Sequence, residues 1–278
     1  MFSLSLEVQL DILKRLNYDQ LISVRQTNFY FYNLINKYEG ELAKMKLKRI
    51  SIIDLDLIEE SHSYKLIQPG SGIFRFTLNN QLKKKWQTAI DKSIPLFLDN
   101  FGSNRNLACE ITVVHDTYIL TLPLIPKNIK EMIIIYFCLE ELFNYAFESA
   151  YFDEVVFNPE IINILFDNNK TLKFHIKEAT LSPINKIFEN SLKFCLNYLS
   201  ISQFLTIHLK FSDISEQHTN ILFNILINRA NKLPKINFSN SKLTKLYDLF
   251  IQYIATSKDC SKLCLLLFLI VFYSEILN

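Results

Sequence analysis

From Leu107 onward, short apolar segments alternate with amphipathic helical segments, and this alternation limits the fold more than any other feature. A strand turns alternate residues to one face and a helix repeats every 3.6 residues, so the two patterns can be distinguished. They predict strands at Glu110 to Val114, Met132 to Phe137, Phe152 to Asn158, Leu172 to Lys177, Leu205 to Phe211 and Lys235 to Ser239. They predict helices at Leu139 to Ser149, Glu160 to Phe166, Pro183 to Leu199, Gln217 to Ala230 and Thr244 to Ala255. We therefore expect an α/β fold.

Successive predicted strands begin about 20 to 33 residues apart, which is a spacing typical of repeat proteins. The units lack the regular L-x-x-L-x-L-x-x-N ladder, so the prediction is an irregular leucine-rich-repeat-like solenoid of β-α units. A closed doubly wound sheet also alternates strands with helices and is the competing architecture. All four glycines precede residue 103, which leaves none in the array for a phosphate-binding turn and favours the solenoid.

The sequence divides into three predicted parts. Residues 1–46 form a helical unit, residues 47–130 a connecting α+β region continuous with the array, and residues 131–278 the repeat array. In the connecting region, Ile50 to Ile58 and Ile73 to Leu78 alternate as strands do. Asn79 or Asn80 can cap the helix that follows, which carries three consecutive lysines and the only tryptophan, Trp86. We expect this helix to be solvated on its lysine side and packed through Trp86, with a phosphate or acidic-protein site as the alternative.

The N-terminal stretch from Leu4 to Tyr38 is predicted to be a compact unit of three short helices. At about 100° per residue, the first helix spreads its apolar residues over roughly 200°. A surface helix needs an apolar stripe of only a little over about 100°, so the surplus indicates a partner in addition to the helix's own core. Asn17 or Asp19 can cap the second helix, and Thr27 or Asn28 the third.

The order of residues in this stretch resembles an F-box: L-S-L-E-V, then Leu10, Ile12-Leu13, Leu16, Asp19-x-Leu21, Val24-Arg25-x-x-Asn28 and aromatics. An F-box docks a substrate receptor on the Skp-family adaptor of a cullin-RING ubiquitin ligase. The whole chain is also similar to the lineage-expanded F-box proteins of nematodes, in which an α/β region follows the F-box. The family usually has Leu-Pro where this chain has Leu4-Ser5. Serine suits a helix start but lacks the rigidity of proline.

The resemblance implies a substrate-recognition subunit of a cullin-RING (SCF-type) ubiquitin ligase that performs no chemistry itself. Its partners would be a Skp-family adaptor, through it a cullin, and a target protein bound by the repeat array. The implied adaptor-binding residues are Leu4, Ser5, Leu6, Glu7, Val8, Ile12, Leu13, Leu16, Leu21 and Val24. The alternative is a non-enzymatic repeat scaffold whose N-terminal helices only cap the solenoid, because repeat arrays need covered ends.

The outward side of the predicted strands offers a candidate target-binding face. The tetrapeptides F-H-I-K and I-H-L-K recur 33 residues apart, so parallel neighbouring strands would bring His175 beside His208 and Lys177 beside Lys210. The net positive charge of such a row would favour an acidic partner segment. Outward strand residues are also polar where they simply meet water, so both interpretations stay open. The predicted target-binding residues are Lys173, His175, Lys177, Thr206, His208, Lys210 and Asn237.

The sequence contains no G-x-S-x-G, H-E-x-x-H or phosphate-loop motif, and its five cysteines lack the paired spacing of a zinc site. We therefore expect no enzymatic activity, no metal and no cofactor. A net charge of +2 gives no overall basic field, which argues against nucleic acid or an anionic membrane as partner.

The two ends of the chain bear on its compartment. The N-terminal residues show no signal-peptide pattern, and the cysteines are predicted to be buried and reduced, so a cytoplasmic or nuclear location is expected. The eleven-residue apolar run from Leu263 to Tyr273 is shorter than the roughly 20 residues that span a bilayer. It is predicted to be a final buried strand, with a membrane anchor as the alternative.

Overall fold

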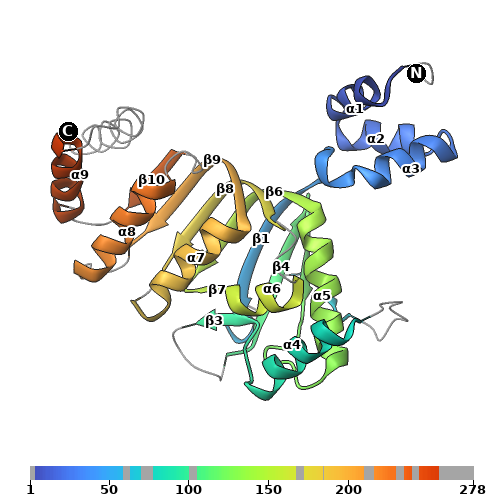
Figure 1. Cartoon of the computed structure of the whole chain (residues 1–278). Helices are drawn as coiled ribbons and strands as arrows, with labels where there is room; N and C mark the ends of the chain where they lie inside the picture. Colours follow the sequence, from blue (N-terminus) through green and yellow to red (C-terminus); the bar gives the residue numbers. More distant parts are fainter. Residues whose placement is uncertain are drawn as a thin grey trace.

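The fold is seen in a computed structural model, in which an N-terminal helical unit leads into a large sheet (Figure 1). The structure describes residues 4–58, 63–69, 78–99, 105–166, 172–183, 185–209, 216–229, 235–239 and 244–256.

Three short helices form the N-terminal unit, drawn in blue in Figure 1: α1 (Leu6–Lys14), α2 (Tyr18–Arg25) and α3 (Phe29–Lys37). Asn17 caps α2 by accepting a hydrogen bond from the backbone N–H of Gln20 at 2.9 Å. Asn28 caps α3 by accepting one from the backbone N–H of Phe31 at 3.0 Å. The predicted trihelical unit is therefore present, and each later helix begins at one of the expected asparagines.

This unit has a hydrophobic core of its own. The buried side chains are distinct from the cluster that lies against the sheet, and they come from all three helices and the turn that follows. They are Leu13, Leu21, Phe31, Leu34, Ile35 and Leu42. The helices therefore fold around one another rather than around the edge of the sheet.

A short connection joins the unit to the sheet. A 3₁₀ turn, η1 (Glu39–Glu41), follows α3, and the Nζ atom of Lys44 then donates a 2.6 Å hydrogen bond to the carbonyl oxygen of Phe143. Phe143 lies at the C-terminal end of a helix, where unpaired carbonyls favour a cation. Burial lowers the pKa of Lys44, partly offset by the charge of Glu39.

A mixed eight-stranded sheet forms the body of the described part, in the order β10-β9-β8-β6-β1-β4-β5-β2. Neighbours are parallel from β1 through β6, β8 and β9 to β10, and β2 is parallel to β5. β4 pairs antiparallel with both β1 and β5. The strands are β1 (Met45–Asp54), β2 (Lys65–Ile67), β4 (Leu107–Val113), β5 (Asp116–Leu120), β6 (Tyr145–Asp153), β8 (Phe174–Ser182), β9 (Leu199–His208) and β10 (Lys235–Ser239). A second, two-stranded sheet pairs β3 (Phe97–Asp99) with β7 (Val155–Phe157).

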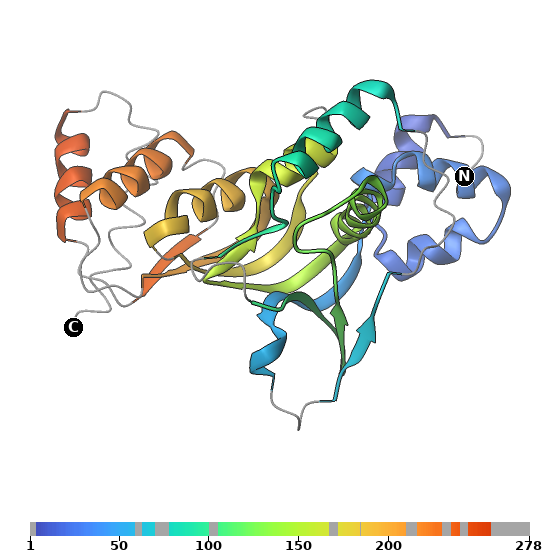
Figure 2. The same cartoon turned by 90° about the horizontal axis from the view of Figure 1, so that it is seen from below.

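The longer helices that follow the first unit cover one face of the large sheet. Figure 2, seen from below, shows α4, α5, α7 and α8 together on one side of the strands. The 3₁₀ turn η2 (Leu55–Leu57), which follows β1, lies on the other side of the strands. A further 3₁₀ turn, η3, spans Asn185–Ile187. The helices are α4 (Asn80–Asp91), α5 (Ile129–Asn144), α6 (Pro159–Phe166), α7 (Phe188–Tyr198), α8 (Glu216–Arg229) and α9 (Thr244–Thr256).

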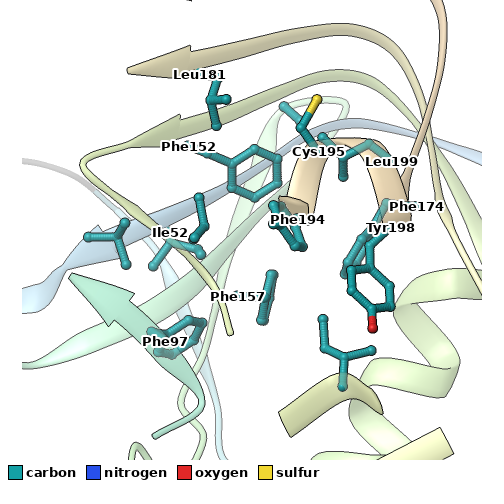
Figure 3. Close-up of a cluster of buried hydrophobic side chains, with 14 of the residues drawn as sticks. Ile52, Phe97, Phe152, Phe157, Phe174, Leu181, Phe194, Cys195, Tyr198 and Leu199 are labelled. Atoms are coloured by element: carbon teal, nitrogen blue, oxygen red, sulfur yellow. The ribbon is translucent and has the colours of Figure 1, made fainter. Parts of the chain in front are cut away.

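Aromatic side chains fill the layer between sheet and helices. Figure 3 shows Phe157, Phe174 and Phe194 converging from β7, β8 and α7. The ring centroids of Phe157 and Phe174 are 5.4 Å apart. Trp86 on α4 is fully buried in the same cluster, and its Nε1–H donates to the carbonyl oxygen of Ile164 at 3.1 Å. The prediction that α4 packs through its tryptophan is confirmed.

The largest error of the sequence prediction lies at α5. The run M-I-I-I-Y-F, expected as a strand from Met132 to Phe137, is helical, and the segment expected as a helix from Leu139 to Ser149 divides between α5 and β6. The helix buries residues at helical spacing: Met132, Ile135, Tyr136, Leu139, Leu142 and Phe143. Asn128 caps it by accepting from the backbone N–H of Glu131 at 3.0 Å. Burial on this stripe and a firm N-cap outweigh the strand preference of consecutive isoleucines.

Other boundaries differ by smaller amounts. β10 begins and ends as predicted, and Asn79 caps α4, whereas β9 begins at Leu199, six residues before the predicted start. The predicted strand at Ile73 to Leu78 falls mainly outside the described residues, as do Lys210 and the apolar run from Leu263 to Tyr273. Across the described ranges, no helix is both long and apolar enough to cross a membrane.

Candidate functional site

Apolar side chains gather, exposed, at the N-terminal end of α1. Leu4 is 39% exposed, and Leu6 and Val8 are each 44% exposed, although the unit has a core in which they could have been buried. Their neighbour Leu13, on the same helix, is completely buried in that core. A helix that buries one stripe and leaves other apolar residues in solvent is typical of a docking surface. The width of the apolar arc predicts this arrangement.

The ten residues that the F-box resemblance implies for adaptor binding differ in their solvent exposure. Leu4, Ser5, Leu6, Glu7 and Val8 are exposed, and Ile12, Leu16 and Val24 are half-buried. Leu13 and Leu21 are buried within the unit, so they can influence a partner only through the fold of the helices. Ser5 occupies the N-cap position of α1, but its side chain makes no cap hydrogen bond.

Sequence reasoning missed an exposed aromatic cluster on the same unit. Phe29 and Tyr32 on α3 are stacked with ring centroids 6.3 Å apart, and the Arg25 guanidinium lies 5.0 Å from the Tyr32 centroid. Phe29 is 77% exposed. Aromatic and arginine side chains are enriched at protein interfaces. The signal in the sequence was the run of four aromatics at residues 29–32, because one helix cannot turn four consecutive side chains toward its core.

A second candidate surface lies on the sheet face that the longer helices leave uncovered. A groove of about 400 Å³ crosses β1, β6, β8 and β9 there. His175 and Lys177 of β8 line it, opposite Lys46 of β1 and Ser200 of β9. Parallel sheets are usually covered on both faces, so a groove across four parallel strands is a natural place for a partner.

The residues predicted to bind the target do not line up in one row across neighbouring strands. His175 pairs in register with Ser200, not with His208, which pairs with Ser239 at the far end of β9. The expected neighbours His175 and His208 are therefore about 25 Å apart along the strands. The reason is the early start of β9 together with a register shift between Ile176 and Glu178, neither of which follows from the repeated tetrapeptide.

The remaining predicted residues fall at different points of the face. Thr206 and Asn237 are in register with each other and with Thr180, several residues along the strands from the groove. Lys173 precedes β8 and is half-buried. The structure thus brings His175 and Lys177 together in one groove and places Thr206, His208 and Asn237 beyond it.

The groove is also less positive than expected. Lys177 lies 3.5 Å from the carboxylate of Glu178, and Glu148 lines the same groove. Burial lowers the pKa of His175 to about 4, helped by the positive charges of Lys44 and Lys173. The imidazole is therefore neutral at physiological pH. Lys46, Lys177 and Glu148 give the groove charges of both signs, and the preference for an acidic partner segment stays a prediction.

Replacing His175 by glutamine is expected to flatten the pH dependence of stability between about pH 6.5 and pH 4. The unfolded chain takes up a proton near the ordinary value of 6.5, whereas the folded chain resists it until about 4, so stability falls as the pH drops through this window. Urea midpoints at pH 7 and pH 5 measure the difference. The control Ser200→Ala alters the strand neighbour without removing a titratable group, and an equal slope in His175→Gln and the wild type would contradict the assignment.

Sequence reasoning also missed a polar cluster beside the groove. The Arg49 guanidinium lies 5.2 Å from the ring centroid of Tyr151, and the hydroxyl of Ser51 donates to Glu110 at 3.1 Å. These residues come from β1, β6 and β4, which are distant in sequence and adjacent only in the sheet. Two further cavities, of about 410 and 360 Å³, flank this cluster on either side of Leu57.

Comparison with known proteins gives one match. A family model described as "Domain of unknown function (DUF8381)" matches residues 67–210, which is more than half of the 278-residue chain. The match runs from Ile67, the last residue of β2, to just beyond β9, so the trihelical unit and β1 lie outside it. No curated protein and no solved structure matches the chain.

Proposed function

The chain belongs to the DUF8381 family, whose defining domain has no known function, and we propose that it is a substrate receptor rather than an enzyme. The N-terminal trihelical unit acts as an F-box and docks on a Skp-family adaptor of an SCF-type ubiquitin ligase. The open face of the sheet holds a target protein, to which other subunits transfer ubiquitin.

The single observation that carries the docking proposal is the division of apolar residues on α1. Leu13 is buried in the core of the trihelical unit, while Leu4, Leu6 and Val8 remain exposed. The F-box resemblance of the same residues supplies the identity of the partner. A solvated apolar cluster on a small helical unit is stabilised when a partner covers it.

The alternative role for these helices, a cap on the repeat array, has less support. A cap would bury its leucines against the first strand of the sheet. Here Leu13 and Leu21 pack within the trihelical unit, and their cluster is separate from the one beneath the strands. A scaffold without an adaptor would also leave Leu4 and Leu6 exposed to solvent with no partner to cover them.

We further propose that β6, β8, β9 and β10 form an irregular leucine-rich-repeat-like array. These strands are parallel and adjacent in chain order, and α6, α7 and α8 lie between successive members in the sequence. The uncovered face of such an array is an extended surface suited to protein binding. The groove beside His175 and Lys177 is its best-defined part. Because both charge signs line it, a polar target segment of mixed charge fits better than an acidic one.

The test is complex formation between the purified full chain and a purified Skp-family adaptor. We expect the two to elute together from a size-exclusion column as a 1:1 complex at micromolar concentration. A chain premixed with an unrelated acidic protein of similar size is the control for nonspecific retention. Separate elution of chain and adaptor at concentrations of about 10 μM, roughly a 7 kcal/mol binding threshold, would rule out the proposal.

A further inference from the structure

One buried polar side chain interrupts the apolar stripe of α1. Gln9 is only 3% exposed, and it lies on the side of the helix that faces the rest of the trihelical unit. Burying an amide costs free energy unless its donors and acceptor are satisfied. A leucine or methionine would fill this position at lower cost, so the glutamine needs a specific reason.

Gln9 lies in the middle of a hydrogen-bond relay between α3 and the residue that precedes the N-cap of α1. The hydroxyl of Tyr30 donates to Oε1 of Gln9 at 2.8 Å, and Nε2 of Gln9 donates to the carbonyl oxygen of Leu4 at 2.7 Å. A carbonyl can only accept, so the amide nitrogen must face Leu4 and the amide oxygen must face Tyr30. The donors therefore all point from Tyr30 toward Leu4. The Tyr30 hydroxyl orients the Gln9 amide, and that amide orients the Leu4 carbonyl.

The relay acts on a part of the chain that the helix cap leaves weakly constrained. Leu4 lies outside α1, and the Ser5 side chain makes no cap hydrogen bond. Serine also lacks the fixed backbone angle of proline. The Gln9 amide instead ties the Leu4 carbonyl to the body of the unit, which fixes the start of the exposed apolar surface formed by Leu4, Leu6 and Val8.

We propose that Gln9 is a positioning residue for docking: the Tyr30–Gln9–Leu4 relay holds the exposed apolar surface of α1 in its binding conformation before the adaptor arrives. This inference rests on the proposed adaptor-docking function. Ordering a flexible segment during association lowers affinity, and a segment that is already ordered avoids that loss. Gln9 itself contributes no contact to the partner, because it is buried.

Substitution of Gln9 separates positioning from folding. Gln9→Met keeps the size and flexibility of the side chain, removes both hydrogen bonds, and leaves an apolar residue on an apolar stripe. We expect the full chain to keep its melting temperature within about 2 °C, because the buried amide and its bonds are removed together. Affinity for the purified Skp-family adaptor, measured by titration calorimetry, should fall about fivefold to tenfold.

The second variant, Tyr30→Phe, removes only the hydroxyl that orients the Gln9 amide. It should weaken binding about threefold. The double variant should bind no more weakly than Gln9→Met alone, because both changes break the same relay. Tyr38→Phe is the matched control, since it removes a tyrosine hydroxyl at the C-cap of the same helix, outside both the relay and the exposed aromatic cluster, and it should bind as the wild type does.

A second readout distinguishes positioning from a purely structural role. In the unbound Gln9→Met chain, the backbone amides of residues 9–12, whose hydrogen bonds hold the first turn of α1, should exchange with deuterium faster than in the wild type, while those of α2 and α3 should not. Equal adaptor affinity and equal exchange in the wild type, Gln9→Met and Tyr30→Phe would overturn the inference. Failure of the wild-type chain to bind the adaptor would instead overturn the proposed function, so the two failures are distinguishable.

Discussion

Replacing Leu6 and Val8 together by aspartate is expected to weaken adaptor binding by about 100-fold or more while the chain remains folded. Both side chains are 44% exposed, so the wild-type fold gains little from their burial. Both also lie in the first turn of α1, where negative charge interacts favourably with the helix dipole. A partner that buries this surface would have to desolvate two carboxylates, which explains the large expected loss.

Titration calorimetry with the purified adaptor measures this loss, and circular dichroism checks that the helices persist. Ile251→Asp is the matched control, because it places aspartate at another exposed apolar position, 58% exposed, on the helix α9. We expect the control to bind with wild-type affinity. Wild-type affinity in the double variant would mean that the exposed end of α1 is not the docking surface.

Replacing Trp86 by alanine is expected to destabilise the chain by about 3–5 kcal/mol. Its side chain is fully buried, packs 6.0 Å from the ring of Tyr136, and donates a hydrogen bond to the Ile164 carbonyl. Removing it leaves a cavity between α4, α5 and α6 and removes the hydrogen bond to the Ile164 carbonyl oxygen. A domain of this kind is stable by only about 5–15 kcal/mol, so the expected loss is a substantial fraction of its stability.

Urea denaturation followed by circular dichroism measures this effect, because the variant lacks the only tryptophan of the chain. Lys84→Ala, two residues earlier on an exposed part of α4, is the control and should change stability by less than about 0.5 kcal/mol. Equal midpoints for Trp86→Ala and the control would contradict the assignment of Trp86 to the core.

Features set by neighbouring residues were predictable from the sequence. Asn17, Asn28 and Asn79 cap helices because a short polar side chain reaches the backbone N–H three residues later, which depends on local chain geometry alone. The bounds of β10 also follow from a local pattern of alternating residues. The exposed surface of α1 followed from the width of its apolar arc, which one helix cannot bury on one side.

Features set by contacts distant in sequence were not predictable in this way. α5 is a helix because residues of its buried stripe meet aromatic rings such as Phe166 and Phe174, which a local reading of consecutive isoleucines cannot include. β1 joins the middle of the sheet through pairs such as Leu47 with Phe147, a hundred residues apart. Gln9 interrupts the apolar arc in the sequence. Its hydrogen bond with Tyr30 joins residues that are 21 positions apart, so a local pattern cannot predict it.

In the proposed function, the trihelical unit docks on an adaptor while the open sheet face stays available for a target. Hydrogen–deuterium exchange of the full chain, with and without a saturating Skp-family adaptor, tests this most directly. We expect protection on binding in residues 4–16 and none in the strands that line the groove beside His175. Protection of the groove without protection of residues 4–16, or no protection in either, would contradict it.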